Sequence, residues 1–347
     1  MDILTEQKED FEEIFFDKKD WVARITINRP KAYNAYSTNC LEELAQAFRQ
    51  ASFDDEVAVI IFTGAGQRAF CTGGDVKEYQ ERYTRSPHDY WKYMRLFGTY
   101  IESIVNSGKP VIARINGMAA GGGNESQMAC DLGVMAEHAW IGQVGSGVGS
   151  VAAGGATQWL PITVGDRRAR HMLMTNRRIP AYQAQDWGLV NEVAPSVKKD
   201  GEFIEHATPE QIKCAQNEEE GYSIDLAMLD TAVDQLAQEL IDKFPECLRY
   251  TKEQTNFWKN LAWHQTIGHA RDWLSIHYAS WEPHEGMSAF VEKRAPRYRM
   301  LRERAASGKS SEFMWGPYTQ VCPSCGAQGI PEEFEYCGVC STKLNNH

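Results

Sequence analysis

Two glycine-rich turns contain the residues of this sequence whose types and spacing are best suited to chemistry. Residues 70–75 read Phe-Cys-Thr-Gly-Gly-Asp, and residues 120–125 read Ala-Gly-Gly-Gly-Asn-Glu. Glycine lets the backbone approach a ligand closely, and a strand-to-helix turn leaves N–H groups free to hold an oxygen that gains negative charge. The alternative for the stretch 116–125 is a tight crossover turn without a ligand.

A pair of such turns has a specific chemical use if the two strand ends converge. One backbone N–H from each turn then binds the same oxygen and stabilises an enolate or a tetrahedral oxyanion. One such donor can stabilise the transition state by about 3–4 kcal/mol. Glu125, beside the second turn, is a candidate general base or acid that handles water. The alternative is a helix-start carboxylate that satisfies local N–H groups. Asp75, after the first turn, is a second candidate acid, although a helix cap is the interpretation we favour for it.

The cysteines indicate a second kind of site. Four of the nine lie in the last 26 residues with the spacing C-x2-C, eleven residues, C-x2-C: Cys322, Cys325, Cys337 and Cys340. Two C-x2-C pairs at this spacing predict four thiolates around Zn²⁺, with iron as the alternative. So short a segment rarely folds without a metal or another cross-link. Four cysteine ligands leave no open coordination position, so we expect a structural metal in a short zinc ribbon.

The elements that must position these residues follow from hydrophobic periodicity. Residues 21–29 alternate and predict a half-buried strand, while apolar residues recur at helical spacing over 41–48. The continuous apolar run 57–62 predicts a strand buried on both faces. A further strand at 111–115 and a helix after Gly123 repeat the unit. An α/β core is therefore predicted.

The second half of the chain is predicted to be mostly helical. Short helices are expected at 166–174 and 180–187, a polar insertion without strong periodicity at 196–222, an amphipathic helix at 226–240, and longer helical stretches at 252–280 and 284–305. The expected domains are a core over 1–222 that includes the insertion, a helical region over 223–305, a linker over 306–320 and a ribbon over 321–347.

Composition limits the class of protein. The chain has 347 residues, of which 43% are hydrophobic, enough for a sizeable core. No run approaches the roughly 18 apolar residues of a membrane span, and residues 1–6 lack the pattern of a signal peptide. We therefore expect a cytoplasmic protein without a membrane partner. The net charge of −11 argues against nucleic acid as a partner.

Five spaced motifs resemble one family. The match covers residues 13–301 and includes Asn28-Arg29-Pro30 with Asn34-Ala35, the turn at 69–75, the turn at 121–125, Cys130-Asp131-Leu132, and Gly142-Gln143-Val144-Gly145. The sequence resembles the crotonase (enoyl-CoA hydratase/isomerase) superfamily. That resemblance implies a ββα spiral core, a helical C-terminal trimerisation region, a homo-oligomer that is a trimer or dimer of trimers, and an acyl-CoA substrate. The ribbon is an addition to this pattern.

The resemblance also implies site residues. The thioester oxygen is held by the amides of Gly74 and Gly122. Substrate and coenzyme A are contacted by residues of the two turns and of two further segments, namely Lys31, Ala32, Thr72, Gly73, Asp75, Gly121, Phe290 and Lys293, of which the last two reach the coenzyme A of a neighbouring subunit. A lysine near phosphate needs no special geometry, so either lysine is equally consistent with a solvated charge. Tyr83, His88 and Tyr90 are weaker candidates for the acyl pocket.

The type of reaction depends on residues 142–157. Hydratases of the family use two acids, and the second position here is Gly145, which argues against simple hydration. Residues 149–157 are similar to hydrolases that open an alicyclic β-oxo ring by water addition and retro-Claisen cleavage, as in anaerobic aromatic degradation through benzoyl-CoA. Ser150 is then expected to hydrogen-bond the ring ketone or to position water, with a plain turn serine as the alternative.

Other reactions remain open from the sequence. Residues 142–150 are also similar to 1,4-dihydroxy-2-naphthoyl-CoA synthase and 2-ketocyclohexanecarboxyl-CoA hydrolase, although Ala152 stands where those enzymes have an aspartate. An enoyl-CoA hydratase is a further alternative. A non-catalytic acyl-CoA-binding scaffold is the alternative of another class.

Overall fold

The computed structural model describes residues 10–312, 319–332 and 334–344. The chain divides into two compact units. The first comprises Met1–Asp75, Arg95–Ser146 and Val151–Ala270, and the second comprises Val76–Met94, Gly147–Ser150 and Arg271–His347. The expected domain boundaries, which follow chain order, stay a prediction.

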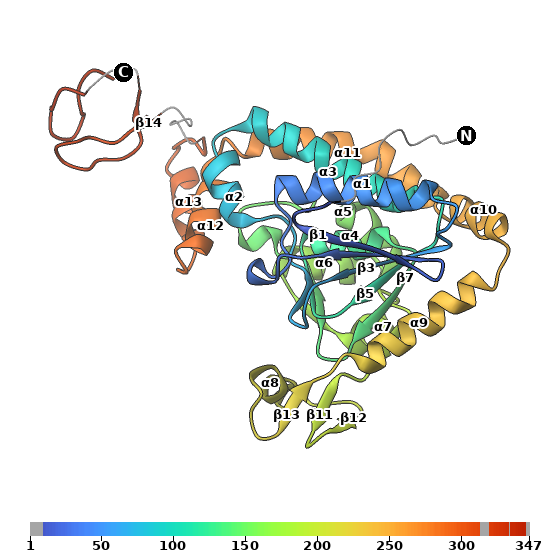
Figure 1. The fold of residues 1–347 in the computed structure, drawn as a ribbon. Coiled ribbons are helices and arrows are strands. Elements are labelled where there is room, and N and C mark those ends of the chain that lie inside the picture. Colours follow the sequence, from blue (N-terminus) through green and yellow to red (C-terminus); the bar gives the residue numbers. More distant parts are fainter. Residues whose placement is uncertain (1–9, 313–318, 333, 345–347) are drawn as a thin grey trace. The chain divides into compact units, whose positions relative to one another are not determined.

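A six-stranded sheet forms the centre of the first unit (Figure 1). Its order is β1 (Ile14–Lys19), β2 (Val22–Ile27), β3 (Val59–Gly64), β5 (Val111–Ile115), β7 (Leu132–Ala136) and β10 (Glu192–Ala194). The pairs from β2 to β10 are parallel, and β1 joins β2 as an antiparallel hairpin. Every residue of β3 and β5 is buried, which confirms the strands predicted from the two apolar runs.

A second sheet contains four short strands, β4 (Ala69–Cys71), β6 (Met118–Ala120), β8 (Trp140–Gly142) and β9 (Arg178–Pro180). The chain enters it three times directly after a strand of the first sheet, from β3 to β4, from β5 to β6 and from β7 to β8. Each strand pair is followed by a helix, so the ββα core is confirmed. The prediction of a direct strand-to-helix turn after Ile115 was wrong, because β6 lies between that strand and the helix.

Helices cover the large sheet of the first unit. α1 (Thr38–Phe53) packs on β1 and β2, and α9 (Ala227–Ile241) packs on β3, β5 and β7 (Figure 1). Leu41, Leu44 and Phe48 are fully buried, which confirms the apolar stripe predicted for α1. The remaining helices of the core are α4 (Gly122–Ala129), α5 (Ala156–Thr163), α6 (Asp166–Thr175) and α7 (Ala181–Asp186).

The polar insertion, whose sequence shows no strong periodicity, folds into an ordered element. β11 (Val197–Lys199) pairs with β12 (Glu202–Ile204) and with β13 (Tyr222–Ile224), and α8 (Pro209–Asn217) packs on this small sheet. Thr208 accepts a hydrogen bond from the Gln211 N–H, and the Gln211 side chain accepts one from the Thr208 N–H, which forms a capping box.

The two long helical stretches predicted near the C-terminus are four helices. They are α10 (Pro245–Thr255), α11 (Phe257–His277), α12 (Trp281–Val291) and α13 (Tyr298–Ala306). Asn256 interrupts the first stretch, where its side-chain amide donates to the Val105 carbonyl. Lys293 has a left-handed backbone with φ of 54° and ends the α12 region, and Pro296 follows before α13.

The second unit contains α2 (Val76–Glu78), a π-helical turn (Tyr79–Tyr83), the start of α3 (Pro87–Val105), and α12 and α13. Its tail has two short strands, β14 (Thr319–Gln320) and β15 (Ile330–Pro331). Part of the predicted linker is paired, because the Trp281 N–H donates to the Ser311 carbonyl. Linker residues 313–318 lie outside the described residues.

Candidate active site

The two glycine turns lie side by side, as expected. β4 and β6 are parallel neighbours in the second sheet, so their carboxyl ends, where the turns begin, are at the same edge. The turns are in contact, because a Cβ on Gly73 would lie 2.8 Å from the amide nitrogen of Gly122. Gly73 and Gly121 have φ of +86° and +56°, which side chains rarely allow.

Packing explains the three consecutive glycines. A Cβ on Gly122 would lie 1.6 Å from the hydroxyl of Tyr36, and a Cβ on Gly123 would lie 1.9 Å from the Cys71 carbonyl oxygen. Gly122 is also the first residue of α4, so its N–H has no partner inside the helix. Each glycine therefore has its own reason: Gly121 has a positive φ, Gly122 presents an amide, and Gly123 allows close contact between helix and strand.

Tyr36 connects the two turns, a role that no pattern in the sequence predicted. Its N–H donates to the Gly73 carbonyl at 2.9 Å, and its carbonyl accepts from the Asp75 N–H at 3.0 Å. In this parallel pairing the intervening Gly74 N–H points away from Tyr36, and it makes no hydrogen bond to a described residue. Neighbouring turns thus present the amides of Gly74 and Gly122, and neither has a hydrogen-bond partner in the part of the chain that the structure describes.

Glu125 lies in the first turn of α4 and is 3% exposed. Its Oε1 accepts hydrogen bonds from the N–H groups of Gly154 at 2.7 Å and Ala156 at 3.0 Å. Oε2 accepts none from any described residue. Burial raises the pKa of Glu125 to about 7, although the two N–H groups act in the opposite direction. The partners come from a distant loop, so the interpretation of a carboxylate that satisfies its own helix is wrong.

Residues 142–157 were expected to decide the type of reaction, but the role of Gly154 and Ala156 in holding Glu125 was missed. A Cβ on Gly154 would lie 2.4 Å from the Phe97 ring and 2.8 Å from Oε2 of Glu125, so only glycine fits there. Gly155 has φ of +115°. The Gly-Gly pair at 154–155 was the available sequence signal.

Asp75 precedes α2, at the position expected of a cap. Its carboxylate pairs with the Arg29 guanidinium at 3.0 Å, and Arg29 also pairs with Glu13 at 2.9 Å. The Thr72 hydroxyl donates to the Tyr33 carbonyl at 3.2 Å. These contacts tie the first glycine turn to the segment after β2.

The predicted coenzyme A contacts are at the surface of their units. Lys31 and Ala32 lie in a 3₁₀ turn (Pro30–Ala32), with Lys31 exposed. Pro30 also lines a cavity of about 230 Å³ in the first unit. Phe290 is 59% exposed at the end of α12, and Lys293 is exposed beyond it, both in the second unit.

The second unit also contains Ser150, which is half-buried near the hydroxyls of Tyr90 and Tyr278. Of the weaker candidates, Tyr83 and Tyr90 are buried, whereas His88 is exposed on α3. Gly145 begins a 3₁₀ turn (Gly145–Gly147) and supplies no acid.

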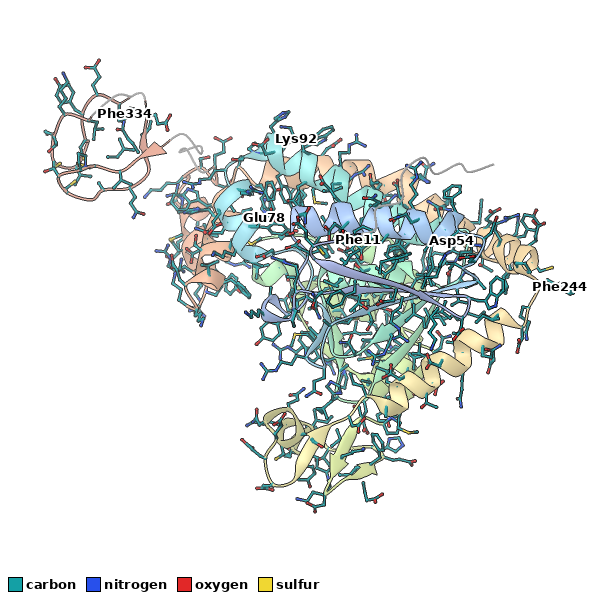
Figure 2. The ribbon with its side chains drawn as sticks, viewed as in Figure 1. Phe11, Asp54, Glu78, Lys92, Phe244 and Phe334 are labelled. Carbon is teal, nitrogen blue, oxygen red and sulfur yellow. The ribbon has the colours of Figure 1, made fainter. Side chains whose placement is uncertain are left out.

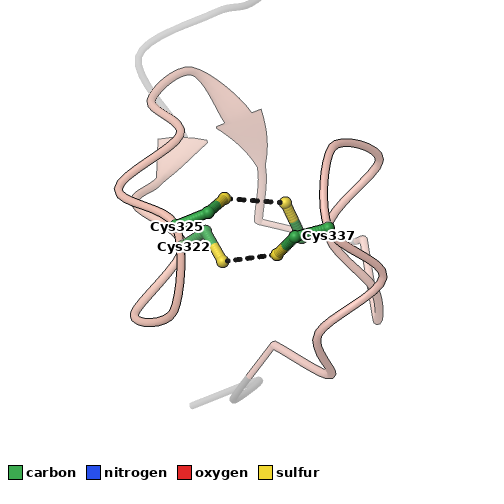
Figure 3. Close-up of side chains that lie close together, drawn as sticks. Cys322, Cys325 and Cys337 are labelled. Atoms are coloured by element: carbon green, nitrogen blue, oxygen red, sulfur yellow. Dashed lines mark hydrogen bonds between the residues drawn. The ribbon is translucent and has the colours of Figure 1, made fainter.

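The four tail cysteines come together as predicted (Figure 3). All four Sγ atoms lie within 4.8 Å of one another, with 3.5 Å between Cys322 and Cys340 and 3.7 Å between Cys325 and Cys337. A tetrahedral zinc site with Zn–S bonds of about 2.3 Å needs sulfur atoms about 3.8 Å apart. The donor set therefore fits a closed metal site.

Fold and paired amides together define a class of protein. The family model described as enoyl-CoA hydratase/isomerase matches residues 17–216, and the chain belongs to this family. An enoyl-CoA hydratase from Mycobacterium avium subsp. paratuberculosis K-10 has the same fold, with a TM-score of 0.67, 24% identity, and coverage of 83% of this chain and 99% of that chain. An enoyl-CoA hydratase from Bacillus anthracis is 29% identical, with a TM-score of 0.59 and coverage of 82% and 98%.

More specific relatives share a larger part of the sequence. The 6-oxocyclohex-1-ene-1-carbonyl-CoA hydrolase of Thauera aromatica is 37% identical over 288 residues, 77% of this chain and 76% of the relative. The proteins of the same name from Geobacter metallireducens and Syntrophus aciditrophicus are 36% and 33% identical, over 78% of this chain. Among the described residues, no helix is long and apolar enough to cross a membrane.

Proposed function

We propose that this protein is a hydrolase that opens the ring of an alicyclic β-oxo enoyl-CoA thioester, with 6-oxocyclohex-1-ene-1-carbonyl-CoA as the substrate to test first. The observation that carries the proposal is the 33–37% identity to hydrolases of that name over about three quarters of both chains. The paired amides and a buried carboxyl group supply the chemistry that such a reaction needs.

The reaction adds two molecules of water. The oxygen of the first bonds to the β-carbon of the conjugated enone, and its proton goes to the α-carbon. The oxygen of the second bonds to the ring-ketone carbon, and the bond between that carbon and the α-carbon breaks. Its electron pair passes into the thioester as an enolate, which takes a proton at the α-carbon, while the former ketone becomes a carboxylic acid.

In this proposal the amides of Gly74 and Gly122 hold the thioester oxygen. Negative charge develops on that oxygen in both stages, as enolate after water addition and again as the carbon–carbon bond breaks. Preorganised N–H donors stabilise charge that appears in the transition state without reorganisation, and the loss of one donor costs about 10²- to 10³-fold in rate. The remaining turn residues, Thr72, Gly73, Asp75 and Gly121, shape this part of the site.

Glu125 is proposed to transfer the protons of water. An effective base or acid has a pKa near the working pH, and burial places that of Glu125 at about 7. Both protonation states are then populated at neutral pH, so one carboxyl group can take a proton from water and return it to carbon. The free Oε2 is the atom available for this transfer.

Coenzyme A is proposed to be held by Lys31 and Ala32, and by Phe290 and Lys293 of a neighbouring copy in a trimer or dimer of trimers. The exposure of Phe290 and Lys293 in this single chain supports the assignment, because such residues are free to contact another subunit. An acyl-CoA substrate also supports a cytoplasmic location.

The tail is proposed to be a zinc ribbon. Cys322, Cys325, Cys337 and Cys340 would hold the ion, which would supply stability to a segment too short for a large core. Among the described residues of the tail, the buried cluster is Cys322, Cys337, Ile330 and Leu344, with Ala327 packed against it. Four thiolate ligands leave no position for substrate, so the proposed role is structural.

Mass spectrometry of the products formed from 6-oxocyclohex-1-ene-1-carbonyl-CoA tests this function. A gain of two waters is expected. A gain of only one water would indicate a hydratase, and binding without any turnover would indicate an acyl-CoA-binding scaffold; both would overturn the proposal. The Glu125→Gln variant is expected to bind the thioester normally and to lose turnover.

A further inference from the structure

Gln143 has no role in the chemistry described so far, although it lies beside the second glycine turn. It follows β8 directly, and it is 2% exposed. Its side-chain Nε2 donates a hydrogen bond to the carbonyl oxygen of Gly121 at 3.1 Å. Both residues belong to the first unit, so this contact lies within one compact part of the chain.

The Gly121 carbonyl is part of the same peptide group as the Gly122 N–H. A trans peptide group is planar, and its C=O and N–H bonds point in opposite directions. A donor that fixes the direction of the Gly121 carbonyl therefore also fixes the direction of the Gly122 N–H. That N–H is the one assigned to the thioester oxygen.

The backbone at Gly121 needs support from outside the turn. Gly121 has φ of 56° and ψ of −123°, a combination that residues with a side chain rarely adopt. Glycine has access to many backbone conformations, so its residue type alone does not select this one. If the peptide group rotated, its carbonyl oxygen would take the place of the Gly122 N–H and would repel an oxyanion.

Three hydrogen bonds hold Gly121 in its conformation. Its N–H donates to the Gly142 carbonyl at 2.9 Å, where the pairing of β6 with β8 ends. Its carbonyl accepts from the Glu125 N–H at 3.1 Å, in the first turn of α4, and from the side chain of Gln143. Of these three bonds, the one from Gln143 comes from a side chain, so a substitution can remove it.

The first glycine turn is supported in an equivalent way. The carbonyl of Gly73, which shares a peptide group with the Gly74 N–H, accepts from the Tyr36 N–H at 2.9 Å. Both proposed donors thus belong to peptide groups whose carbonyls are held by a hydrogen bond. Such a bond also polarises the peptide group, which makes its N–H a stronger donor.

We propose that Gln143 is a positioning residue, which holds the peptide group between Gly121 and Gly122 so that the Gly122 N–H meets the thioester oxygen. Gln143 acts through this peptide group and does not touch the substrate. The inference rests on the proposed function, because it takes the Gly122 N–H as a donor to a thioester. A donor fixed in advance needs no reorganisation when charge develops, and a donor that can turn away loses this advantage.

The test measures the thioester carbonyl directly. Cyclohexanecarbonyl-CoA has neither the ring ketone nor the double bond of the proposed substrate, so it should bind without ring opening. Hydrogen bonds from the two amides lower the stretching frequency of its carbonyl, and infrared difference spectra with an isotopic label at the thioester carbon report this shift. In Gln143→Met the shift is expected to fall by about half or more, because one of the two donors is no longer held in place.

Gln127→Met is the matched control. Gln127 is also a buried glutamine, but its Nε2 donates to the Asn124 side chain at 2.9 Å and not to the turn. This variant should keep the infrared shift and a kcat within about threefold of the unmodified protein. Gln143→Met should lower kcat for ring opening by about 10- to 100-fold, with KM changed less than about threefold, because the charge on the thioester oxygen is largest in the transition state.

A full infrared shift in Gln143→Met would overturn the inference, and so would an equal loss of the shift in Gln127→Met. If Gln143→Met does not fold, Gln143→Asn should lose the shift in the same way, because its amide is one methylene too short to reach the Gly121 carbonyl. A full shift in that variant would be equally decisive.

The unmodified protein separates this inference from the proposed function. No infrared shift in its complex would overturn the assignment of the two amides, and the role of Gln143 with it. A product with fewer than two added waters would instead overturn ring opening, while the infrared comparison of the variants would still decide the role of Gln143.

Discussion

Glu125 is subject to two opposing effects on its proton. Removal of the carboxyl group from water favours the neutral form, while the N–H groups of Gly154 and Ala156 favour the charged form. Burial is the larger effect, because the pKa rises from 4.5 to about 7. Two hydrogen bonds to one oxygen leave the other free, so the balance produces a carboxyl group able to exchange protons at neutral pH.

The pH dependence of the reaction follows from that pKa. We expect kcat/KM to rise with one-proton dependence as Glu125 ionises, with an apparent pKa near 7, because water addition needs the carboxylate as base. Measurement of initial rates from pH 5 to 9 checks this. A profile flat across that range would contradict Glu125 as the base.

Stability should depend on the same proton. Between pH 4.5 and about 7 the folded protein keeps a proton that the unfolded chain has released, so its free energy of unfolding falls as pH rises through this window. The total loss is about 3 kcal/mol by pH 8. Glu125→Gln should remove this dependence and be the more stable protein at pH 8. Denaturant unfolding of both proteins at pH 5 and pH 8 measures this change. If the free energies of unfolding of Glu125→Gln and the unmodified protein differed by the same amount at both pH values, burial of Glu125 would not be the cause.

The Tyr36 hydroxyl occupies the space that a side chain at position 122 would need. Gly122→Ala should destabilise the protein by about 1–3 kcal/mol, because the new methyl group meets the Tyr36 hydroxyl. Addition of Tyr36→Phe removes that hydroxyl and should restore part of the loss.

The control for this pair is Gly268→Ala on α11, where no atom of the described residues outside the adjoining helix backbone lies within 4 Å of the new Cβ. Because alanine favours a helix interior more than glycine does, this variant should be more stable to unfolding by up to about 1 kcal/mol. Thermal unfolding of the unmodified protein, the two single variants, the double variant and Gly268→Ala gives the comparison, and additive effects of Gly122→Ala and Tyr36→Phe would contradict the contact.

At the scale of elements, long apolar segments were predicted well and short ones poorly. β3, β5 and α1 are long enough for their burial pattern to be visible in the sequence. β4 and β6 have three residues each, too few for any periodicity, and their strand character comes from pairing with each other. The small sheet at 197–224 was missed for the same reason, although Thr208 and Gln211 carried a cap signal.

The loop between β8 and α5 is the element on which Glu125 depends. Gly154→Ala would place a methyl group against Phe97 and Glu125 and push the loop amides away from the carboxylate. We expect kcat to fall at least about tenfold, because small displacements of a catalytic group are costly. Loss of the amide donors should also raise the apparent pKa of the rate profile. Gly268→Ala again serves as the control, and an unchanged profile in Gly154→Ala would argue against this role of the loop.

At the scale of the whole molecule, the chain combines a family core with a separate cysteine cluster. The first unit holds both glycine turns and Glu125, and the second holds Ser150 and the four cysteines. Figure 2 shows that side chains such as Phe244, 80% exposed between α9 and α10, also present apolar surface. The chain thus carries, beyond the residues that the family model matches, a cysteine cluster whose donor set fits a metal site.

Loss of the metal from the tail should leave the rate of ring opening almost unchanged. Cys337→Ser is expected to lose the bound zinc, as would removal of residues 318–347, while ring opening stays within about threefold, because a closed four-cysteine site offers no position to substrate. Cys247→Ser, at an exposed cysteine outside the cluster, should keep its metal. Elemental analysis with parallel rate measurements checks this, and full zinc retention in Cys337→Ser would refute the assigned ligands.

The sequence by itself determined the family, the two glycine turns and the four-cysteine cluster. These features are encoded over a few neighbouring residues, since a left-handed turn requires glycine and a knuckle requires two cysteines at fixed spacing. Only the tertiary structure decided the pKa of Glu125 and the connection through Tyr36. Each depends on burial and on partners tens of residues away or more, and such contacts exist only once the chain has packed.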